Sequence, residues 1–183
     1  MHNLIFPISN RQATKILLNL NDFMKSISDS SEKLNSLKAI LFGGLLAGVL
    51  DLTAACVSNY WISPIRVFQA IASGLLGAES YNGSAATAML GIFLHFVIAF
   101  GASIVYYIVS RKVKFLINQA IISGVIYGIA VFCFMQFVVL PLSAFPGKNQ
   151  FELNQTIIGL VVHILFVGLP IALVIRRYSK SEK

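Results

Sequence analysis

Four apolar stretches constrain the fold of this chain more than any other feature. They cover roughly residues 39–60, 85–107, 119–140 and 155–175. Each is long enough to cross the hydrocarbon core of a bilayer, about 30 Å thick, as a helix. Lipid offers no partners to backbone polar groups, so helices are expected rather than isolated strands. The sequence therefore predicts an all-α, polytopic membrane protein built as an antiparallel bundle of four transmembrane helices.

The composition supports this class of protein. Hydrophobic residues make up 57% of the chain and charged residues 11%, whereas a soluble domain carries about 25% charged residues. These values argue against a soluble enzyme, a disordered chain and a disulfide-built secreted scaffold. Two cysteines, Cys56 and Cys133, lie within apolar stretches and are expected to be free, small apolar residues.

The residues outside the four stretches divide the chain into three parts. Residues 1–38 are predicted to be a cytoplasmic N-terminal segment, residues 39–178 the transmembrane domain, and residues 179–183 a cytoplasmic tail. Apolar residues recur at helical spacing between Ala13 and Ile27, which predicts an amphipathic helix. This helix would lie on the membrane surface or pack on the bundle. The run Ser28–Ser31 should interrupt it.

Two further segments lie between the stretches. From Pro64 to Gly77 an amphipathic pattern, too short to span, starts with a proline that a first helical turn accepts. It predicts a short helix that lies in the outer interface or dips partway into the membrane. The second outer loop, residues 140–152, is expected to be irregular, because it holds two prolines and a glycine.

Basic residues predict the orientation. All of the 14 Lys and Arg residues except Arg66 and Lys148 lie before the first stretch, between the second and third, or after the fourth. Cytoplasmic loops carry the excess of Lys and Arg in membrane proteins. Both termini are therefore expected in the cytoplasm, and the net charge of +7 is assigned to orientation and anionic lipid headgroups rather than to nucleic acid.

Four polar residues lie inside the stretches: Asp51, His95, His163 and Gln136. An Asp at the centre of a membrane helix costs about 2.5–3.5 kcal/mol on insertion scales, so such residues normally face a partner inside the bundle. At about 1.5 Å per residue, Asp51 and His95 lie roughly 18 Å from the cytoplasmic helix ends, His163 about 20 Å and Gln136 about 25 Å. An Asp51–His95 pair is the favoured contact. Arg66 could form an outer ion pair with Asp51 or Glu79.

Small residues share the helix faces of Asp51, His95 and His163, and such faces are where membrane helices meet. Gly44-xxx-Gly48 and Gly124-xxx-Gly128 match the small-xxx-small packing pattern. Gly91 and Gly159 lie on the same faces as His95 and His163. All six glycines are candidates for close helix packing.

The polar residues allow two interpretations. They could form a polar centre that handles protons, a metal ion or a small polar solute. They could equally hold helices in register, at about 0.6 kcal/mol per hydrogen bond. A bis-histidine haem site, or a metal site from Asp51, His95 and His163, has the ligand types but no specific motif. No cofactor, metal or catalytic residue is predicted, and no phosphate loop, Rossmann fingerprint, nucleophile elbow or HExxH motif is present.

Three runs carry a family resemblance: SPIRVFQAIASGLLG (residues 63–77), LGIFLHFVIAFGASIVYYIVSRKV (90–113) and VVLPLSAFP (138–146). They resemble a group of small uncharacterised bacterial inner-membrane proteins with four helices, over roughly residues 40–178. A fainter likeness, to YagU-type inner-membrane proteins associated with acid resistance, rests on the helices of His95 and His163, the basic turn Arg111–Lys114, and Arg176 and Arg177. The resemblance implies placement in a bacterial inner membrane.

Three functions follow as hypotheses. The first is permeation of a small solute, or proton-linked transport, through a centre at Asp51 and His95. Four helices rarely enclose a pathway, so a homo-oligomer or another membrane protein is the expected partner besides the lipid bilayer. The second is a non-catalytic structural or assembly partner. The third is an intramembrane haem or metal protein.

Overall fold

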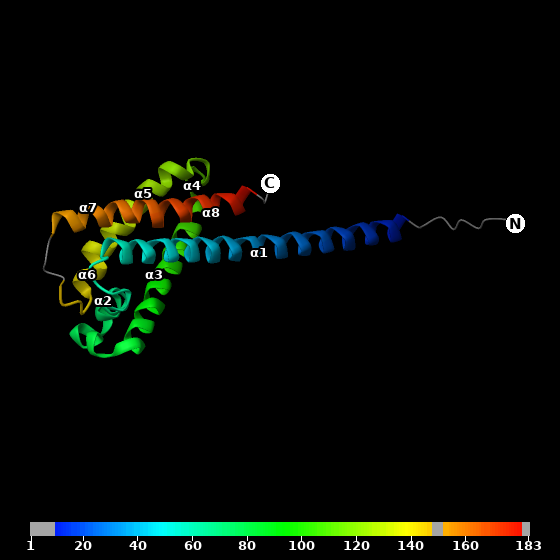
Figure 1. Cartoon of the computed structure of the whole chain (residues 1–183). Coiled ribbons are helices and arrows are strands. Elements are labelled where there is room, and N and C mark those ends of the chain that lie inside the picture. Colours follow the sequence, from blue (N-terminus) through cyan, green and yellow to red (C-terminus); the bar gives the residue numbers. More distant parts are fainter. Residues whose placement is uncertain (1–9, 148–151, 181–183) are drawn as a thin grey trace.

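The computed structural model describes residues 10–147 and 152–180, and in these residues every regular element is a helix. Four helices within the described part are long and apolar enough to cross a membrane: Leu17–Ser58, Ser84–Lys112, Ala120–Leu142 and Leu153–Ser179. The prediction of an all-helical chain with four membrane-length helices is confirmed. These helices indicate a multi-pass membrane protein (Figure 1).

The first helix is much longer than the sequence indicated. Helix α1 runs without interruption over Asn10–Ser58, 49 residues, so the expected break at Ser28–Ser31 is wrong. Serine hydroxyls here bond back into the helix instead of ending it, since Ser30 Oγ donates to the Ser26 carbonyl at 2.8 Å. The N-terminal half of α1 therefore projects from the other helices as an extension of the first span (Figure 1).

Several elements follow between the first span and the third. Helix α2 covers Pro64–Leu76 with Pro64 in its first turn, and the 3-10 helix η1 covers Gly77–Asn82. Helix α3 covers Ser84–Lys112, and α4 is a single turn, Phe115–Asn118. Gly91 of α3 lies directly against the backbone of Phe68, so α2 packs tightly across the first turns of α3.

The third and fourth spans each contain a π-helical turn before a proline. The third consists of α5 (Ala120–Phe134), the π-turn η2 (Met135–Val139) and α6 (Leu140–Leu142). The fourth consists of α7 (Leu153–Val162), the π-turn η3 (His163–Gly168) and α8 (Leu169–Lys180). The sequences FVVLPL (137–142) and FVGLPI (166–171) are alike at the two turns.

The prolines give these turns a physical cause. Proline has no N–H and its ring clashes with the carbonyl four residues earlier, so it disturbs the preceding helical turn. The residue before each proline donates its N–H five residues back, Leu140 to Met135 and Leu169 to Ile164. A wider turn of this kind absorbs the disturbance without ending the helix.

Helices α1 and α3 are joined by polar contacts at a constant antiparallel register. Glu32 pairs with Arg111, and Ser36 shares a hydrogen bond with the Tyr107 hydroxyl. Ser103 Oγ donates to the Ile40 carbonyl at 2.9 Å, and His95 bonds the Gly48 carbonyl at 2.9 Å. From one contact to the next, the residue number rises by four or eight on α1 and falls by the same number on α3. The contacts therefore lie along one face of each helix. We call this series the α1–α3 ladder.

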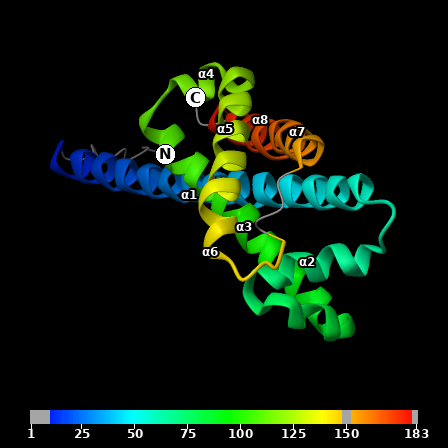
Figure 2. The same cartoon turned by 90° about the vertical axis from the view of Figure 1, so that its left-hand side faces the viewer.

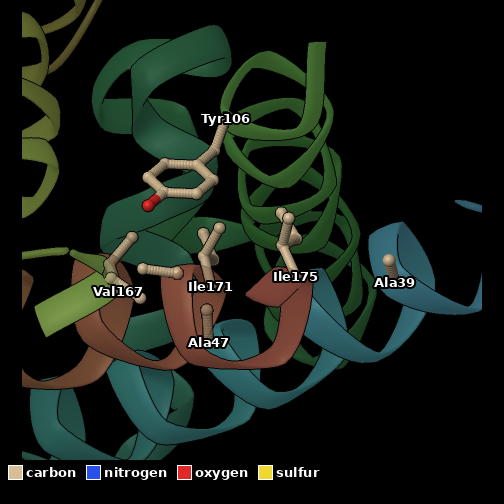
Figure 3. Packing of buried hydrophobic residues seen from close by; sticks show 8 residues of the cluster. Ala39, Ala47, Tyr106, Val167, Ile171 and Ile175 are labelled. Carbon is tan, nitrogen blue, oxygen red and sulfur yellow. The ribbon is translucent and has the colours of Figure 1, made fainter. Parts of the chain in front are cut away.

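The buried core gathers where α1, α3, α5 and α8 meet. Helices α7 and α8 run alongside α1 in the opposite direction, and α5 lies across them (Figures 1 and 2). Tyr106 projects into the cluster and donates its hydroxyl to the Leu116 carbonyl at 3.0 Å. Figure 3 shows the packing. The buried members are Ala39, Ala47, Tyr106, Ala120, Val167, Ile171, Ala172 and Ile175.

Candidate functional site: the intramembrane polar layer

His95 belongs to the α1–α3 ladder. Its Nε2 lies 2.9 Å from the Gly48 carbonyl, and because a carbonyl only accepts, this nitrogen carries the proton. A neutral His95 ring then keeps Nδ1 as an acceptor. A Cβ on Gly48 would lie 2.6 Å from Phe96 Cε1, so the absence of a side chain lets α3 approach α1 closely at this point. The His95 ring contacts the α1 backbone at this close approach.

Asp51 lies one helical turn beyond Gly48 and is partly buried. The expected direct Asp51–His95 pair is not formed, because the ring bonds the Gly48 backbone instead. Among residues 10–147 and 152–180, no side chain forms a hydrogen bond or ion pair with the Asp51 carboxylate. Asp51 is three residues after Gly48, so its side chain leaves α1 about one helical turn from the carbonyl that the ring contacts.

His163 is the first residue of η3 and is also partly buried. Its Nδ1 donates to the Gly159 carbonyl at 2.8 Å, one turn earlier in the same helix. Its ring lies edge-on to Phe132 of α5, with centroids 5.6 Å apart. The other ring nitrogen, Nε2, does not take part in this bond, which is the complement of the arrangement at His95.

The antiparallel register places Asp51 and His163 at the same level. A Cβ on Gly43 would lie 3.9 Å from the Ile171 Cα, which fixes how α1 and the last span face each other. Asp51 lies eight residues after Gly43 on α1, and His163 lies eight residues before Ile171 on the fourth span. Because the two helices run in opposite directions, these two steps lead the same way along the pair. By this count Asp51 and His163 lie at about the same level, and His95, which contacts Gly48, lies within about one helical turn of it. We call these three residues the polar layer.

The polar layer is not a preformed metal centre. Within the described part of the chain, no group of three or more His, Cys, Asp and Glu residues is placed to hold a metal ion. Cys56 and Cys133 are free thiols. Asp51, His95 and His163, which the sequence suggested as metal ligands, thus lie at similar depth, but their side chains do not converge on a common point.

Gln136 lies apart from the polar layer. It is the second residue of η2 and lines an apolar groove of about 520 Å³ between α2, α3 and the third span. The Ala144 N–H donates to the Gly74 carbonyl at 2.8 Å and bridges one end of the groove. Its other lining residues are Val67, Ala70, Ile71, Gly74, Leu75, Leu94, Val97, Ile98, Met135, Val139, Leu140, Ser143 and Phe145.

Arg66 does not form the expected outer ion pair. Its Nη1 donates to the Tyr81 carbonyl at 3.2 Å, and its guanidinium lies 5.7 Å from the centroid of the Tyr81 ring. The Glu79 carboxylate accepts from the Asn82 side-chain amide at 3.2 Å instead. Because α2 leads into η1, the side chain of Arg66 faces Tyr81 rather than α1.

The candidate packing glycines lie at close helix contacts. Gly44 faces Phe100, Gly48 faces Phe96, and Gly159 faces Phe132. Gly124 and Gly128 lie against the backbone of the fourth span at Leu169 and Ile164. Gly168, which the sequence analysis did not single out, faces the backbone of both Gly124 and Gly128.

A buried polar cluster between α2, η1 and α3 was also missed. Gln69 is 2% exposed and donates its amide to the Ser84 carbonyl at 2.9 Å. Ser84 has a left-handed φ of 51°, unusual for a residue with a side chain. Thr87 Oγ1 donates to the Ser80 carbonyl at 2.6 Å. The sequence did show a glutamine on the polar face of an amphipathic helix. Its burial, however, depends on how α2 packs against α3.

Comparisons with protein-family models, curated proteins and solved structures gave no match. The chemistry of the described residues therefore carries any functional conclusion.

Proposed function

We propose that the protein mediates proton-linked permeation of a small solute or ion across a bacterial inner membrane, with the polar layer as its centre. Both termini lie in the cytoplasm, as the distribution of Lys and Arg favours. The four long helices cross the membrane, and α2 lies at the outer interface. The observation that carries the proposal is an Asp51 carboxylate that has no hydrogen-bonding partner among residues 10–147 and 152–180 and lies near the level of two histidines.

The chemistry of the layer suits proton transfer. Each histidine uses one ring nitrogen to bond a backbone carbonyl, and its other ring nitrogen remains available as an acceptor. Imidazole changes charge in the physiological pH range and can exchange protons with a carboxylate. A charged group at mid-membrane depth is costly, and such groups commonly mark ion or proton pathways.

The pathway requires more than one copy of the chain. Two described apolar cavities, of about 310 Å³ and 520 Å³, are lined by α2, α3 and the third span and do not include the polar layer. Asp51 is only partly buried by its own chain. A neighbouring copy would shield the carboxylate from lipid and complete a polar route.

Proton flux in proteoliposomes tests the proposal. The purified protein is reconstituted with a pH-sensitive dye inside the vesicles, and a pH gradient is imposed under a clamped membrane potential. The parent should dissipate the gradient faster than protein-free vesicles, and Asp51→Asn should not. Asp22→Asn is the matched control, because Asp22 is exposed on the projecting half of α1. Equal flux for the parent and Asp51→Asn would refute the role of the polar layer.

A second candidate function is favoured by the projecting half of α1. Its Leu17, Phe23 and Met24 side chains are more than half exposed. A chain with a partly exposed intramembrane carboxylate and a long unpacked helix suits a structural or assembly partner. Co-purification of one distinct membrane protein after gentle extraction, together with absent proton flux, would favour this function.

A further inference from the structure

The N-terminal part of α1 projects beyond the other helices of the structure. The first contact of the α1–α3 ladder is Glu32 with Arg111, so Asn10–Ser31 extends beyond the other spans. We call Asn10–Ser31 the arm. Its 22 residues would reach about 33 Å at 1.5 Å per residue. Figure 1 shows that it continues in line with the span. If residues 39–58 cross the membrane, a helix that continues in line with them leaves the membrane along the direction of the span.

Five exposed apolar side chains of this region fall at positions a and d of a heptad repeat, while Leu18 at b and Phe23 at g are also exposed. With Leu17 at position a, Leu20 and Ile27 fall at d and Met24 at a, and Leu34 at d continues the series. These five residues, which we call the arm stripe, are 50–63% exposed. Apolar residues at a and d are typical of helices that wrap around each other. Helices of this length rely on packing of such a face for most of their stability.

Charged residues avoid the arm stripe. Lys15, Asp22 and Asp29 occupy position f, Lys25 and Glu32 position b, and Lys33 position c. In a coiled coil these positions face water, whereas a, d, e and g contact the partner. Glu32 also contacts α3 from the side opposite the stripe. The protein's own helices therefore leave the stripe open to a partner.

We propose that the arm stripe binds the arm of a second copy of this chain in a parallel, in-register helical association. Membrane insertion argues for this occupant: copies inserted in one orientation project their arms in the same direction. Their spans also start at the same depth, so each stripe residue meets its own counterpart. Positions e and g carry no charge between Asn21 and Ser30, so identical helices meet without like-charge repulsion. The inference does not depend on the proton-linked function.

Disulfide trapping in membranes tests the proposal. In the full chain with Cys56→Ala and Cys133→Ala, Leu20→Cys places a thiol in the stripe and Asp22→Cys places one at position f. A mild oxidant should cross-link Leu20→Cys into dimers and leave Asp22→Cys monomeric, because only stripe thiols approach within the Cβ–Cβ range of about 3.5–4.5 Å. Equal cross-linking of both variants, or none in Leu20→Cys while its thiol reacts with maleimide, would overturn the proposal.

The mass of the purified protein gives an independent measurement. The double variant Leu20→Asp, Met24→Asp places two charges in the stripe, and Asn19→Asp, Ser26→Asp places the same charges at position c. The first should lower the oligomer mass measured by light scattering and the second should not. An unchanged mass in the first variant, or a different protein held by the stripe in the parent, would contradict self-association. Proton flux measured on the same samples shows separately whether the polar layer functions.

Discussion

Asp51 and His95 are neighbours in depth, but their side chains have different surroundings. His95 Nε2 donates to the Gly48 carbonyl and helps to join α1 to α3. Asp51 has no hydrogen bond or ion pair with any described side chain and adds nothing of that kind to the interface. A hydrogen bond within membrane helices contributes about 0.6 kcal/mol on average and at most about 1.7 kcal/mol. The two residues should therefore differ in their effect on stability.

We expect His95→Ala to lower the melting temperature in mild detergent, with a loss of roughly 0.6–1.7 kcal/mol from the hydrogen bond. Asp51→Asn should melt at or above the parent, because it replaces a carboxylate that costs about 2.5–3.5 kcal/mol at the helix centre. Thermal unfolding followed by circular dichroism measures both. If Asp51→Asn melts well below the parent, Asp51 has a structural partner and the proposed proton-transfer role is weakened.

Among the helical elements, α5 and the fourth span approach each other closely at the backbone. Gly124 and Gly128 face Leu169 and Ile164, and Gly168 in the π-turn η3 faces both glycines. Close approach of this kind allows dense van der Waals packing where lipid supplies no hydrophobic driving force. The π-turn before Pro170 helps to set which residue of the fourth span faces α5, so the proline and the glycines act together.

Gly168→Ala should destabilise the protein by about 1–3 kcal/mol or more, because its Cβ would meet backbone atoms of α5 that cannot move aside easily. Gly101→Ala is the matched control. A Cβ on Gly101 meets nothing within 4 Å, so this change should be neutral or stabilise by up to about 1 kcal/mol through helix propensity. Thermal unfolding of both variants tests the contact, and similar melting temperatures would contradict it.

The whole molecule is asymmetric along the direction of α1. The core cluster, the α1–α3 ladder and the basic turn after α3 lie toward the end from which the arm projects, and α2 and η1 lie toward the other end. If basic residues mark the cytoplasmic side, the arm is cytoplasmic and η1 is on the outer side. With this orientation, the proposed association between arms would take place on the cytoplasmic side of the membrane.

Thiol labelling in whole cells tests the orientation. In the chain with Cys56→Ala and Cys133→Ala, Asn82→Cys in η1 should react with a membrane-impermeant maleimide from outside. Ser26→Cys in the arm should react only after the membrane is permeabilised. Both residues are exposed, so a difference in labelling reports the side of the membrane. The reverse pattern would place the termini outside and contradict the orientation inferred from Lys and Arg.

The sequence by itself determined the helical class and the number of membrane-length helices. A run of about 20 apolar residues has few alternatives to a helix in lipid, so local composition is sufficient. The sequence also indicated glycines at the close contacts and three ionisable residues at similar depth. It misjudged Ser28–Ser31, because serine is favoured at helix ends but can bond back into a continuing helix.

Only the tertiary structure decided which partners these residues have. Whether His95 meets Asp51 or the Gly48 carbonyl depends on the rotation and separation of α1 and α3, a few ångströms that no single-helix pattern encodes. The same holds for Arg66, which faces Tyr81, and for Gln69, which α2 buries against α3. Hydropathy and spacing are local properties of one helix, whereas hydrogen-bond partners depend on how two helices pack.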